Sequence, residues 1–398
     1  MKLEEAQEVV LKNADLQGTV ETELLQSLGL TLGEDIRADR DQPPFDRALV
    51  DGVAVRAEDG RARRTLLPQT VAAGHWPEFT LERGQAVRIM TGAPVPRGAD
   101  TVVKREDVLI ADGTVELVAE IERGRNIALR AGELRQGGLA APKGTRITPA
   151  VLALLASFGR QTVRVYEPVR VAVVTTGDEI VEYNIAPGPS QIRNSNAFTL
   201  LGLLEFNGAD AGYVGIARDS VEEIVPALRG ALDRDLVIMT GGSAEGDFDL
   251  AGKAIETIGA RVYFRSVAIR PGRPVRFAKI GRKALFSLPG NPASVVVDYH
   301  LLVRPYLDAC LGVPEPLPPY HVGSLATPIL KKGARRRFLH GRARSTAEGV
   351  EVEPFAMVGA SDLVNLARAN CLLALPEGEV SLQAGATVRY LRLDDPSH

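Results

Sequence analysis

The hydrophobic pattern is clearest between residues 169 and 311, where short, almost entirely apolar runs alternate with segments of helical periodicity. The apolar runs predict strands at Val169–Thr175, Gly212–Ile216, Leu236–Met239, Val262–Ile269 and Ala284–Leu288. The segments between them predict helices at Ser195–Phe206, Ser220–Leu232, Asp249–Ile258 and Ala293 to about Leu311. Fully apolar strands that alternate with helices are typical of a parallel sheet covered on both faces.

The flanking regions have a different pattern. Residues 3–30 carry apolar positions at helical spacing, and Gly29 is placed to end a helix. Residues 41–135 are rich in Val, Thr, Gly and Pro, with short alternating runs that indicate a β-rich domain. A further helix is predicted at 148–158, with Thr148 as its N-cap. Beyond a proline-rich linker, residues 320–398 predict a small β-barrel or sandwich.

These patterns together predict a multidomain α/β protein built around a central doubly wound parallel sheet. A β-rich inserted domain, an N-terminal helical segment and a C-terminal small β-barrel surround it. We expect a discontinuous helical and linker domain at 1–40 and 136–168. The other expected domains are the β-rich domain at 41–135, the α/β domain at 169–312 and the C-terminal β domain at 320–398.

Composition and charge exclude several classes of protein. The chain has 398 residues and a formal net charge of −3, which gives no reason to expect nucleic-acid binding. The two cysteines, Cys310 and Cys371, do not form a disulfide framework, so a reducing compartment fits best. The acidic N-terminus does not resemble a signal peptide, and no apolar run is long enough to span a membrane. We therefore expect a cytoplasmic protein.

Three of the predicted strands end in polar, glycine-rich sequence. These ends are Thr175-Thr176-Gly177-Asp178-Glu179, Thr240-Gly241-Gly242 and Leu288-Pro289-Gly290-Asn291-Pro292. In an open parallel sheet, ligands bind at the carboxyl ends of the strands, and glycines let backbone N–H groups approach a phosphate. Any one of these loops could be an ordinary strand-to-helix turn, but three at one edge favour a ligand site.

Acidic residues accompany the same edge: Asp178, Glu179, Asp247 and Asp249. Carboxylates beside phosphates commonly hold a bridging Mg²⁺, which prefers oxygen ligands. The alternative is that they cap helix N-termini, and for Asp249 the two possibilities are evenly balanced.

Arg270-Pro271-Gly272-Arg273-Pro274 follows a predicted strand. Two arginines on a rigid turn suit an oxyanion such as molybdate or phosphate. The alternative is a pair of surface arginines that pair with Asp247 and Asp249. The sequence shows no Ser-His-Asp or Cys-His arrangement, and its five histidines lack metal-ligand spacing.

In order along nearly the whole chain, these and other motifs resemble the molybdopterin molybdenumtransferase (MoeA) family, which includes the gephyrin E domain. Pro43 to Arg56 is similar to the family's PPFDxSAMDGYAVR, and Arg88 to Pro94 is similar to RIxTGAP. Further motifs follow as TGDE at 176–179, IRNSN at 192–196, TGG at 240–242, RPGRP at 270–274, LPGNP at 288–292 and ARAN at 367–370.

The resemblance implies Mg²⁺-dependent insertion of molybdate into adenylylated molybdopterin, with release of AMP. It implies a molybdopterin-binding central domain, a homodimer and a possible contact with a molybdopterin adenylyltransferase. Catalytic roles would fall to Asp51, Thr91, Glu179 and Asp249, and metal binding to Asp247, Asp249 and Glu179. Substrate binding would fall to Thr176, Gly177, Asp178, Ser195, Asn196, Thr240, Gly241, Gly242, Arg270, Arg273, Pro289, Gly290, Asn291 and Pro292. For Asp51, an ordinary Asp-Gly turn is an equal alternative.

The sequence also departs from the family's motifs. Ala244 stands at the serine of GGVSVGDYD, Leu134 stands at the last acid of NIRxxGED, and both lysines of KPGKP are arginines. These departures leave two other hypotheses open. One is a molybdopterin-binding or scaffold paralogue without turnover. The other is a relative of molybdopterin adenylyltransferases or nucleotide hydrolases, which lack the PPFD and RIxTGAP motifs.

Overall fold

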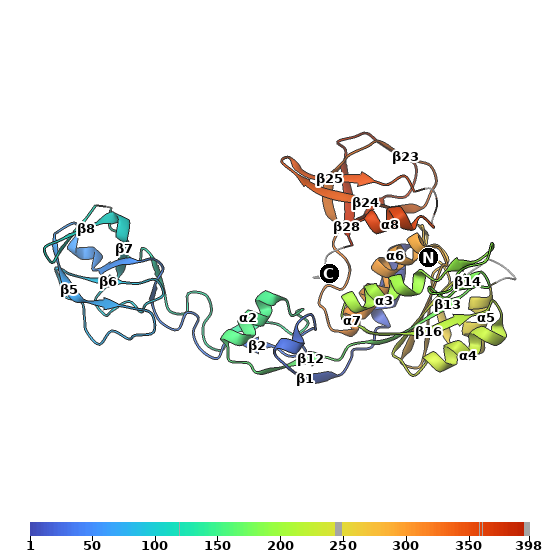
Figure 1. The fold of residues 1–398 in the computed structure, drawn as a ribbon, viewed down its shortest axis with the longest axis horizontal. Helices are drawn as coiled ribbons and strands as arrows, with labels where there is room; N and C mark the ends of the chain where they lie inside the picture. The colour runs from blue at the N-terminus through green and yellow to red at the C-terminus, as the bar shows by residue number, and fades with distance from the viewer. Residues whose placement is uncertain (119, 243–248, 358, 360, 394–398) are drawn as a thin grey trace. The chain divides into compact units, whose positions relative to one another are not determined.

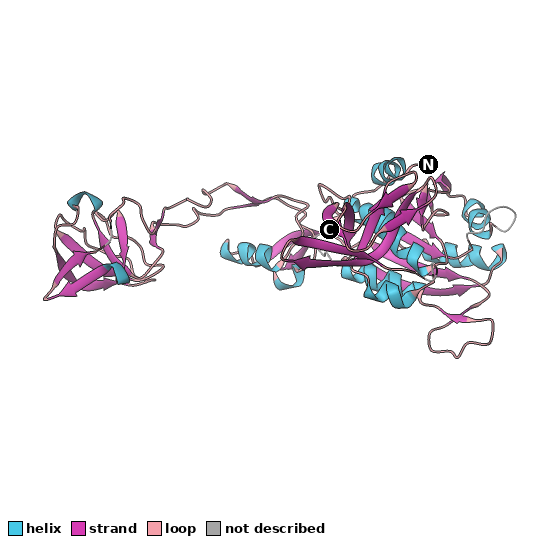
Figure 2. Ribbon diagram, turned by 90° about the horizontal axis from the view of Figure 1, so that it is seen from above, coloured by secondary structure: helices cyan, strands magenta, loops and turns pink. Residues whose placement is uncertain are grey.

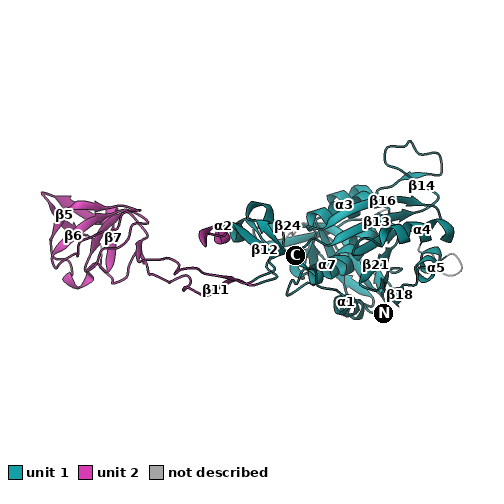
Figure 3. Ribbon diagram, turned by 90° about the horizontal axis from the view of Figure 1, so that it is seen from below, with its two compact units in different colours: residues 1–34, 143–153, 161–398 teal, residues 35–142, 154–160 magenta. Residues whose placement is uncertain are grey.

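The computed structural model describes residues 1–398 apart from 119, 243–248, 358, 360 and 394–398. Within the described residues the chain forms two compact units (Figure 3). Unit 1 comprises residues 1–34, 143–153 and 161–398, and unit 2 comprises residues 35–142 and 154–160. The finer division into the four domains expected from the sequence remains a prediction.

The centre of unit 1 is a six-stranded sheet with the strand order β16-β13-β17-β21-β20-β18 (Figure 1). The first four strands are parallel to their neighbours, whereas β20 and β18 pair antiparallel at one edge. The bounds are β13 Arg170–Thr176, β16 Asp210–Ala217, β17 Leu236–Thr240, β18 Arg261–Phe264, β20 Arg276–Ile280 and β21 Lys283–Leu288. The predicted parallel sheet is confirmed for its four central strands.

Helices cover both faces of this sheet, as predicted (Figure 2). Alternate residues of β13 divide between two cores, with Val171 and Val173 in one and Ala172 and Val174 in the other. The first core is closed by helices α1 (Leu3–Lys12), α3 (Asn196–Phe206), α6 (Pro292–Asp298) and α7 (Arg304–Cys310). The second core is closed by α4 (Val221–Ala231) and α5 (Leu250–Thr257). This division is why the strand sequences are apolar at every position.

One local prediction in this region was wrong, one strand was missed, and one predicted helix is present with an irregular middle. The strand expected at Val262–Ile269 is divided into β18 and a short β19 (Ile269–Arg270), which leaves the sheet and pairs with β24 (Arg336–Thr346) of the C-terminal domain. The sequence did not predict strand β20, because Arg276 and Lys279 interrupt its apolar residues. Both side chains are paired with carboxylates. Between α6 and α7, residues Tyr299–Val303 form a π-helical segment, so the predicted helix from Ala293 to Leu311 is irregular.

The prediction of one helix across residues 3–30 was wrong. Helix α1 ends at Lys12, and the chain then forms β1 (Thr19–Glu23), which pairs antiparallel with β12 (Thr162–Tyr166). The β1 sequence TVETE alternates between β-branched and acidic residues, a pattern that favours a strand over a helix. A 3-10 turn at Leu25–Ser27 follows. The helix predicted near 148–158 is present as α2 (Pro149–Ser157), and the Thr148 hydroxyl accepts a hydrogen bond from the Val151 amide at 3.3 Å.

The C-terminal region closes into a five-stranded barrel, as the sequence predicted. Strands pair in the ring β24-β25-β22-β28-β26, and β26 pairs again with β24, so the ring has no free edge. The remaining bounds are β22 His321–Leu325, β23 Ile329–Lys331, β25 Gly349–Pro354, α8 Leu363–Arg368, β26 Cys371–Leu375, β27 Val380–Leu382 and β28 Thr387–Arg392.

Unit 2 is β-rich, with a six-stranded sheet in the order β7-β4-β6-β5-β9-β8. Its strands are β4 Gly52–Val55, β5 Arg64–Val71, β6 Gln85–Ile89, β7 Thr101–Lys104, β8 Val108–Ala111 and β9 Thr114–Leu117. Two short pairs join β2 (Ile36–Arg37) with β11 (Leu139–Ala141) and β3 (Arg47–Ala48) with β10 (Ile127–Ala128). The 3-10 turns are Ala57–Asp59 and Arg105–Asp107. Among the described helices, none is long and apolar enough to cross a membrane.

Candidate functional site

A cavity of about 750 Å³ lies at the carboxyl ends of the central strands of unit 1. It lies where β13, β17 and β21 end and where the short pair β14 (Ile180–Val181) and β15 (Ile192–Arg193) leaves the sheet. The predicted site residues that line this cavity are Thr176, Gly177, Glu179, Ser195, Asn196, Thr240, Gly241, Gly242, Gly290, Asn291 and Pro292. The three strand-end loops therefore converge on one cavity, as the sequence analysis expected of a parallel sheet.

The floor of the cavity is tight enough to require glycine. Gly241 has a φ of +95°, and a Cβ atom there would lie 2.3 Å from the carbonyl oxygen of Thr176. Gly242 has a φ of +62°, and its Cβ would lie 3.0 Å from the Thr176 hydroxyl. The TGG motif thus lets the ends of β13 and β17 approach closely and leaves backbone at the cavity surface.

Some buried polar atoms around this cavity have no hydrogen-bond partner among the described residues. They are the hydroxyls of Thr176 and Thr240 and the side-chain carbonyl of Asn196. The Asn196 amide is fixed because it donates to the Gly290 carbonyl at 2.8 Å. Buried polar groups are normally paired, so unpaired ones at a cavity wall indicate groups that meet a ligand.

Asn194 lines the cavity and stabilises its wall through side-chain hydrogen bonds. Its side-chain amide donates to the Tyr213 hydroxyl at 2.9 Å, and its carbonyl accepts the Ala197 amide at 3.2 Å in the first turn of α3. Tyr213 in turn donates to Glu182 at 3.0 Å. Burial and the Glu182 carboxylate raise the pKa of Tyr213 to about 12, so this hydroxyl stays protonated. The network holds the start of α3, and hence Asn196, against the cavity.

Three carboxylates gather at one side of the cavity: Asp178, Glu179 and Asp219. Glu179 and Asp219 line it, whereas Asp178 accepts the Asp219 main-chain amide at 3.2 Å from outside the lining. Burial, and then the charges of Asp178 and Glu179, raise the pKa of Asp219. Among the residues described, no three His, Cys, Asp or Glu side chains are grouped closely enough to hold a metal ion by themselves. A cation here would need ligands from a substrate or water as well.

Asp219 was missed by the sequence analysis. It follows β16, the fourth parallel strand, so it stands at a strand end like the three loops that were recognised. The end of β16 was overlooked because it contains no glycine-rich motif.

Asp249 has a structural role in this protein. Its Oδ1 accepts the Gly252 amide at 3.0 Å and caps α5, and its Oδ2 lies 2.6 Å from Nη2 of Arg276. Burial lowers the pKa of Arg276, and the Asp249 carboxylate opposes that shift. Asp249 does not line the cavity, so capping, the alternative considered for it, is observed. Asp247 lies outside the described residues.

The arginine turn lies outside the cavity lining. Arg270 and Arg273 are exposed on either side of Gly272, and strand pairing brings Arg270 beside Arg337 of the C-terminal barrel. Burial, and next the charge of Arg270, lower the pKa of Arg337. Arg337 belongs to the basic run Arg335–Arg337, and its strand pairing with Arg270 could not be predicted from sequence spacing. Like charges brought together in this way favour an anion.

A buried carboxyl group lies directly beneath this turn. A Cβ at Gly272, whose φ is +99°, would be 2.1 Å from Oδ1 of Asp298. Asp298 is fully buried, and neither of its oxygens has a hydrogen-bond partner in the described part of the chain. Burial raises its pKa well above the usual value, which favours the neutral form of this carboxyl group.

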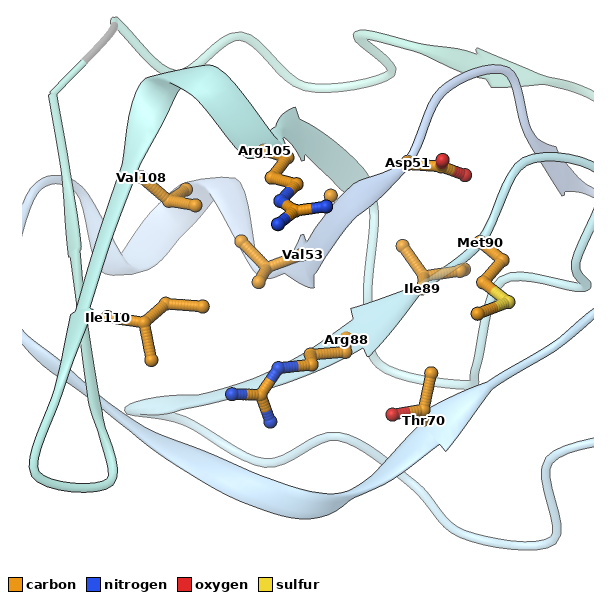
Figure 4. A pocket seen from close by; sticks show the side chains of 10 residues that line it. Asp51, Val53, Thr70, Arg88, Ile89, Met90, Arg105, Val108 and Ile110 are labelled. Carbon is orange, nitrogen blue, oxygen red and sulfur yellow. The ribbon is translucent and has the colours of Figure 1, made fainter.

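Asp51 and Thr91 lie together in unit 2. The Thr91 amide and hydroxyl donate to Asp51 Oδ1 at 2.7 and 2.8 Å. These hydrogen bonds, the amide's first, lower the pKa of Asp51. Asp51 also lines a separate cavity of unit 2, which Figure 4 shows from close by. The remaining predicted residue, Pro289, precedes Gly290 without lining the cavity of unit 1.

Comparison with known proteins covers almost the whole chain. Residues 1–159 match the family described as MoeA N-terminal region (domain I and II). Residues 172–309 match the probable molybdopterin binding domain, and residues 322–393 match the MoeA C-terminal region (domain IV).

Individual relatives agree with these matches. A molybdopterin molybdenumtransferase of Staphylococcus epidermidis is 33% identical over 98% of this chain and 94% of its own length. One of Staphylococcus aureus is 31% identical over 97% of this chain and 94% of its own. A crystal structure of a molybdopterin biosynthesis MoeA protein from Pyrococcus horikoshii has a TM-score of 0.74 and 32% identity, covering 99% of both chains. The chain therefore belongs to the molybdopterin molybdenumtransferase family, whose members are transferases of molybdenum cofactor biosynthesis.

Proposed function

We propose that this chain inserts molybdenum from molybdate into adenylylated molybdopterin, with Mg²⁺ and with release of AMP. The observation that carries the proposal is the strand-end cavity of unit 1 with its unpaired buried atoms on Thr176, Thr240 and Asn196. Three such atoms around about 750 Å³ suit a large polar ligand with donors and acceptors in several directions.

The cavity residues would bind and orient this substrate. Gly241 and Gly242 expose backbone to it, and the hydroxyls of Thr176 and Thr240 can each donate one hydrogen bond. The start of α3, whose N-cap Ser195 makes no side-chain capping hydrogen bond, has a positive dipole end that favours a phosphate nearby. Binding of this kind brings the reacting groups together and removes the entropic cost of their encounter from the chemical step.

Glu179 and Asp219 are the residues that fit Mg²⁺. Both line the cavity, and Asp219 Oδ1 has no described partner. Burial, and after it the charges of Asp178 and Glu179, raise the pKa of Asp219, and a cation beside it would favour its charged form. When bound, the ion would neutralise charge on the phosphoanhydride that is cut. The two carboxylates would hold it while phosphate oxygens and water complete its shell.

Arg270, Arg273 and Arg337 would hold molybdate. Guanidinium groups can each donate to two oxygens of a tetrahedral dianion, and the strand pairing of Arg270 with Arg337 brings two of them together before the anion arrives. In the reaction the two dithiolene sulfurs of the pterin would bind molybdenum, and the displaced molybdate oxygen would leave as water with the two thiol protons. The arginines would keep the anion oriented during this exchange.

A glycine variant tests the substrate cavity. Gly241→Ala would place a methyl group 2.3 Å from the Thr176 carbonyl, so the floor must move. Gly259→Ala is the matched control, because Gly259 also has a positive φ, of +83°, but nothing lies within 4 Å of its Cβ position. We expect adenylylated molybdopterin to bind at least tenfold more weakly to Gly241→Ala alone. Equal binding by both variants would mean that the substrate lies elsewhere.

Anion titrations test the arginine turn. Charged hydrogen bonds are worth ~1.5–3 kcal/mol, so Arg270→Ala and Arg273→Ala should weaken molybdate binding about tenfold to a hundredfold with the fold intact. Arg229→Ala, at an exposed position in the last turn of α4, is the control. A lowered melting temperature with unchanged affinity would show that the two arginines are structural.

Two copies of the chain would form a homodimer under this proposal. Large apolar side chains on and beside α3 are exposed, among them Tyr183, Phe198 and Phe206, and Tyr183 packs edge-on against Phe198 at 4.8 Å. Exposed apolar patches of this kind are typical of interaction surfaces. Light scattering should give about twice the chain mass of 42.7 kDa, and a single-chain mass at micromolar concentration would contradict the proposal. A cytoplasmic location and a contact with a molybdopterin adenylyltransferase complete the proposed setting.

A second candidate is a paralogue that binds the pterin without turnover. Leu134 favours it, since the family's motif has an acid there, and an apolar side chain cannot replace a carboxylate; the Leu134 backbone exchanges hydrogen bonds with that of Gln42. Substrate binding without molybdenum insertion would distinguish it.

A further inference from the structure

The cavity of unit 2 is not used by the mechanism above, although Asp51 lies at its edge. It has a volume of about 540 Å³, which is within the ordinary range of small-molecule sites. Its lining comes from β4, β5, β6 and β8, all strands of the six-stranded sheet of this unit (Figure 4).

Two arginines supply its charge. Arg88, on β6, is the cross-strand neighbour of Val53 on β4 and of Thr70 on β5, and Arg105 follows β7. Figure 4 shows Val53 between the two guanidinium groups. In the part of the chain that the structure describes, neither side chain has an ion pair or a side-chain hydrogen bond. Elsewhere in the unit, Arg47 is paired with Glu133 and Arg130 with Asp41.

The rest of the lining is largely apolar. Val53 and Ile89 are buried in the sheet, and Met90 and Ile110 keep 51% and 40% of their surface exposed around the two arginines. The single carboxylate, Asp51, already accepts two hydrogen bonds from Thr91, which leaves the cavity with an excess of positive charge. Guanidinium groups beside exposed apolar walls suit a flat organic ligand that carries an anionic group.

We infer that this cavity binds a phosphate-bearing heterocycle, with Arg88 and Arg105 on the phosphate and the ring against the apolar wall. The identification of the ligand class rests on the proposed function, because both halves of adenylylated molybdopterin, the nucleotide and the pterin, are phosphate esters of flat heterocycles. The cavity itself, its charge and its lining do not depend on that function.

Methionine methyl signals provide a local measurement on the whole chain. The chain has four methionines; Met90 lines this cavity, whereas Met239 is buried in β17 of unit 1. The chain is labelled with ¹³C at the methionine methyl groups and titrated separately with AMP, 6-carboxypterin and inorganic phosphate. AMP represents the nucleotide half and 6-carboxypterin an anionic pterin.

We expect AMP or 6-carboxypterin to shift the Met90 signal saturably, and the active probe identifies the half that binds. Arg88→Gln and Arg105→Gln should each raise the midpoint about tenfold, and added salt should raise it further. Arg61→Gln, at an exposed arginine of the same unit outside the cavity, should leave it unchanged. Inorganic phosphate should bind more weakly than the active probe.

Three outcomes would overturn the inference. They are a Met90 signal that neither organic probe moves, midpoints that are the same in Arg88→Gln and Arg105→Gln as in the wild type, and phosphate binding as tight as that of the organic probe. None of them depends on whether the chain inserts molybdenum, so this inference and the proposed function can fail separately.

Discussion

Thr91 donates two hydrogen bonds to the same oxygen of Asp51, one from its main-chain amide at 2.7 Å and one from its hydroxyl at 2.8 Å. The pair joins the family's DG and TGAP motifs, which are 40 residues apart in the sequence. The Thr91 amide alone would keep one hydrogen bond to Asp51. The Thr91 hydroxyl adds a second one, which further fixes the carboxylate's orientation and favours its charged form. Among the described residues no hydrogen bond to the other oxygen of this exposed carboxylate is seen, so that oxygen is available to a substrate.

Variants of this pair separate charge from orientation. If Asp51 acts on the substrate as an anion, Asp51→Asn should lower the rate of molybdenum insertion by about a hundredfold or more. Thr91→Val, which keeps the amide, should lower it only a few-fold. Since the Thr91 hydrogen bonds lower the pKa of Asp51, losing the hydroxyl should shift the acid limb of the pH–rate profile to higher pH. Asp112→Asn, in an exposed turn of unit 2, is the control. A wild-type rate in Asp51→Asn would show that Asp51 has no catalytic role and only forms an Asp-Gly turn.

Asp249 should behave as a structural residue. Asp249→Asn keeps an acceptor for the α5 cap but leaves Arg276, whose side chain is 6% exposed, without its anion. Breaking a buried pair in this way costs roughly 3 kcal/mol of unfolding free energy. Urea denaturation measures the cost, and Asp178→Asn provides a comparison at an exposed carboxylate. Unchanged stability with lost activity would instead support the metal role that the sequence suggested.

Asp298 should destabilise the protein at neutral pH. Its raised pKa means that the folded protein keeps it protonated, while the unfolded chain ionises it above its usual value near 4. The contribution to stability is therefore present at low pH and is lost as the pH rises. Asp298→Asn removes the penalty, so it should raise the denaturation midpoint at pH 7 and change it little at pH 3. Equal effects at both pH values would show that folding does not shift the pKa of Asp298.

Two buried histidines predict the opposite pH dependence. Burial, followed by Arg304 and His340, lowers the pKa of His300 to about 3, and burial lowers that of His340 to about 4. The unfolded chain binds protons at these groups near pH 6.5, so stability should fall as the pH decreases from there towards 4 and below. Each histidine changes the free energy of unfolding by up to about 1.4 kcal/mol per pH unit. His300→Phe should remove one proton's share of that slope, and an unchanged slope would contradict the assignment.

Much of the fold was predictable because the apolar pattern is strong where strands are covered on both faces. Val171 to Val174 alternate between two cores, which makes β13 apolar throughout. Strand β20 was not predictable in the same way, since its buried Arg276 is acceptable only because Asp249, distant in sequence, neutralises it. The break after α1 was missed because its apolar spacing continues into β1, which is stabilised by pairing with β12.

The site was predictable where one motif supplies one loop. Strand-end geometry brings Thr176, Gly241 and Gly290 to one cavity without further information. Arg337 and Asp298 were not predictable, because their relation to the arginine turn depends on how the barrel strand and the helix meet it. The pairing of Asp51 with Thr91 likewise needs the register of β4 with β6.

The most direct test of the proposed function is reconstitution with purified protein, adenylylated molybdopterin, molybdate and Mg²⁺, followed by quantification of AMP and of pterin-bound molybdenum. The proposal predicts equal amounts of the two products from the wild type and from Gly259→Ala. It predicts loss of both products when Mg²⁺ is omitted and in Gly241→Ala. If the wild type binds the substrate tightly but releases no AMP and inserts no molybdenum, the chain is a binding paralogue and the proposed insertion is wrong.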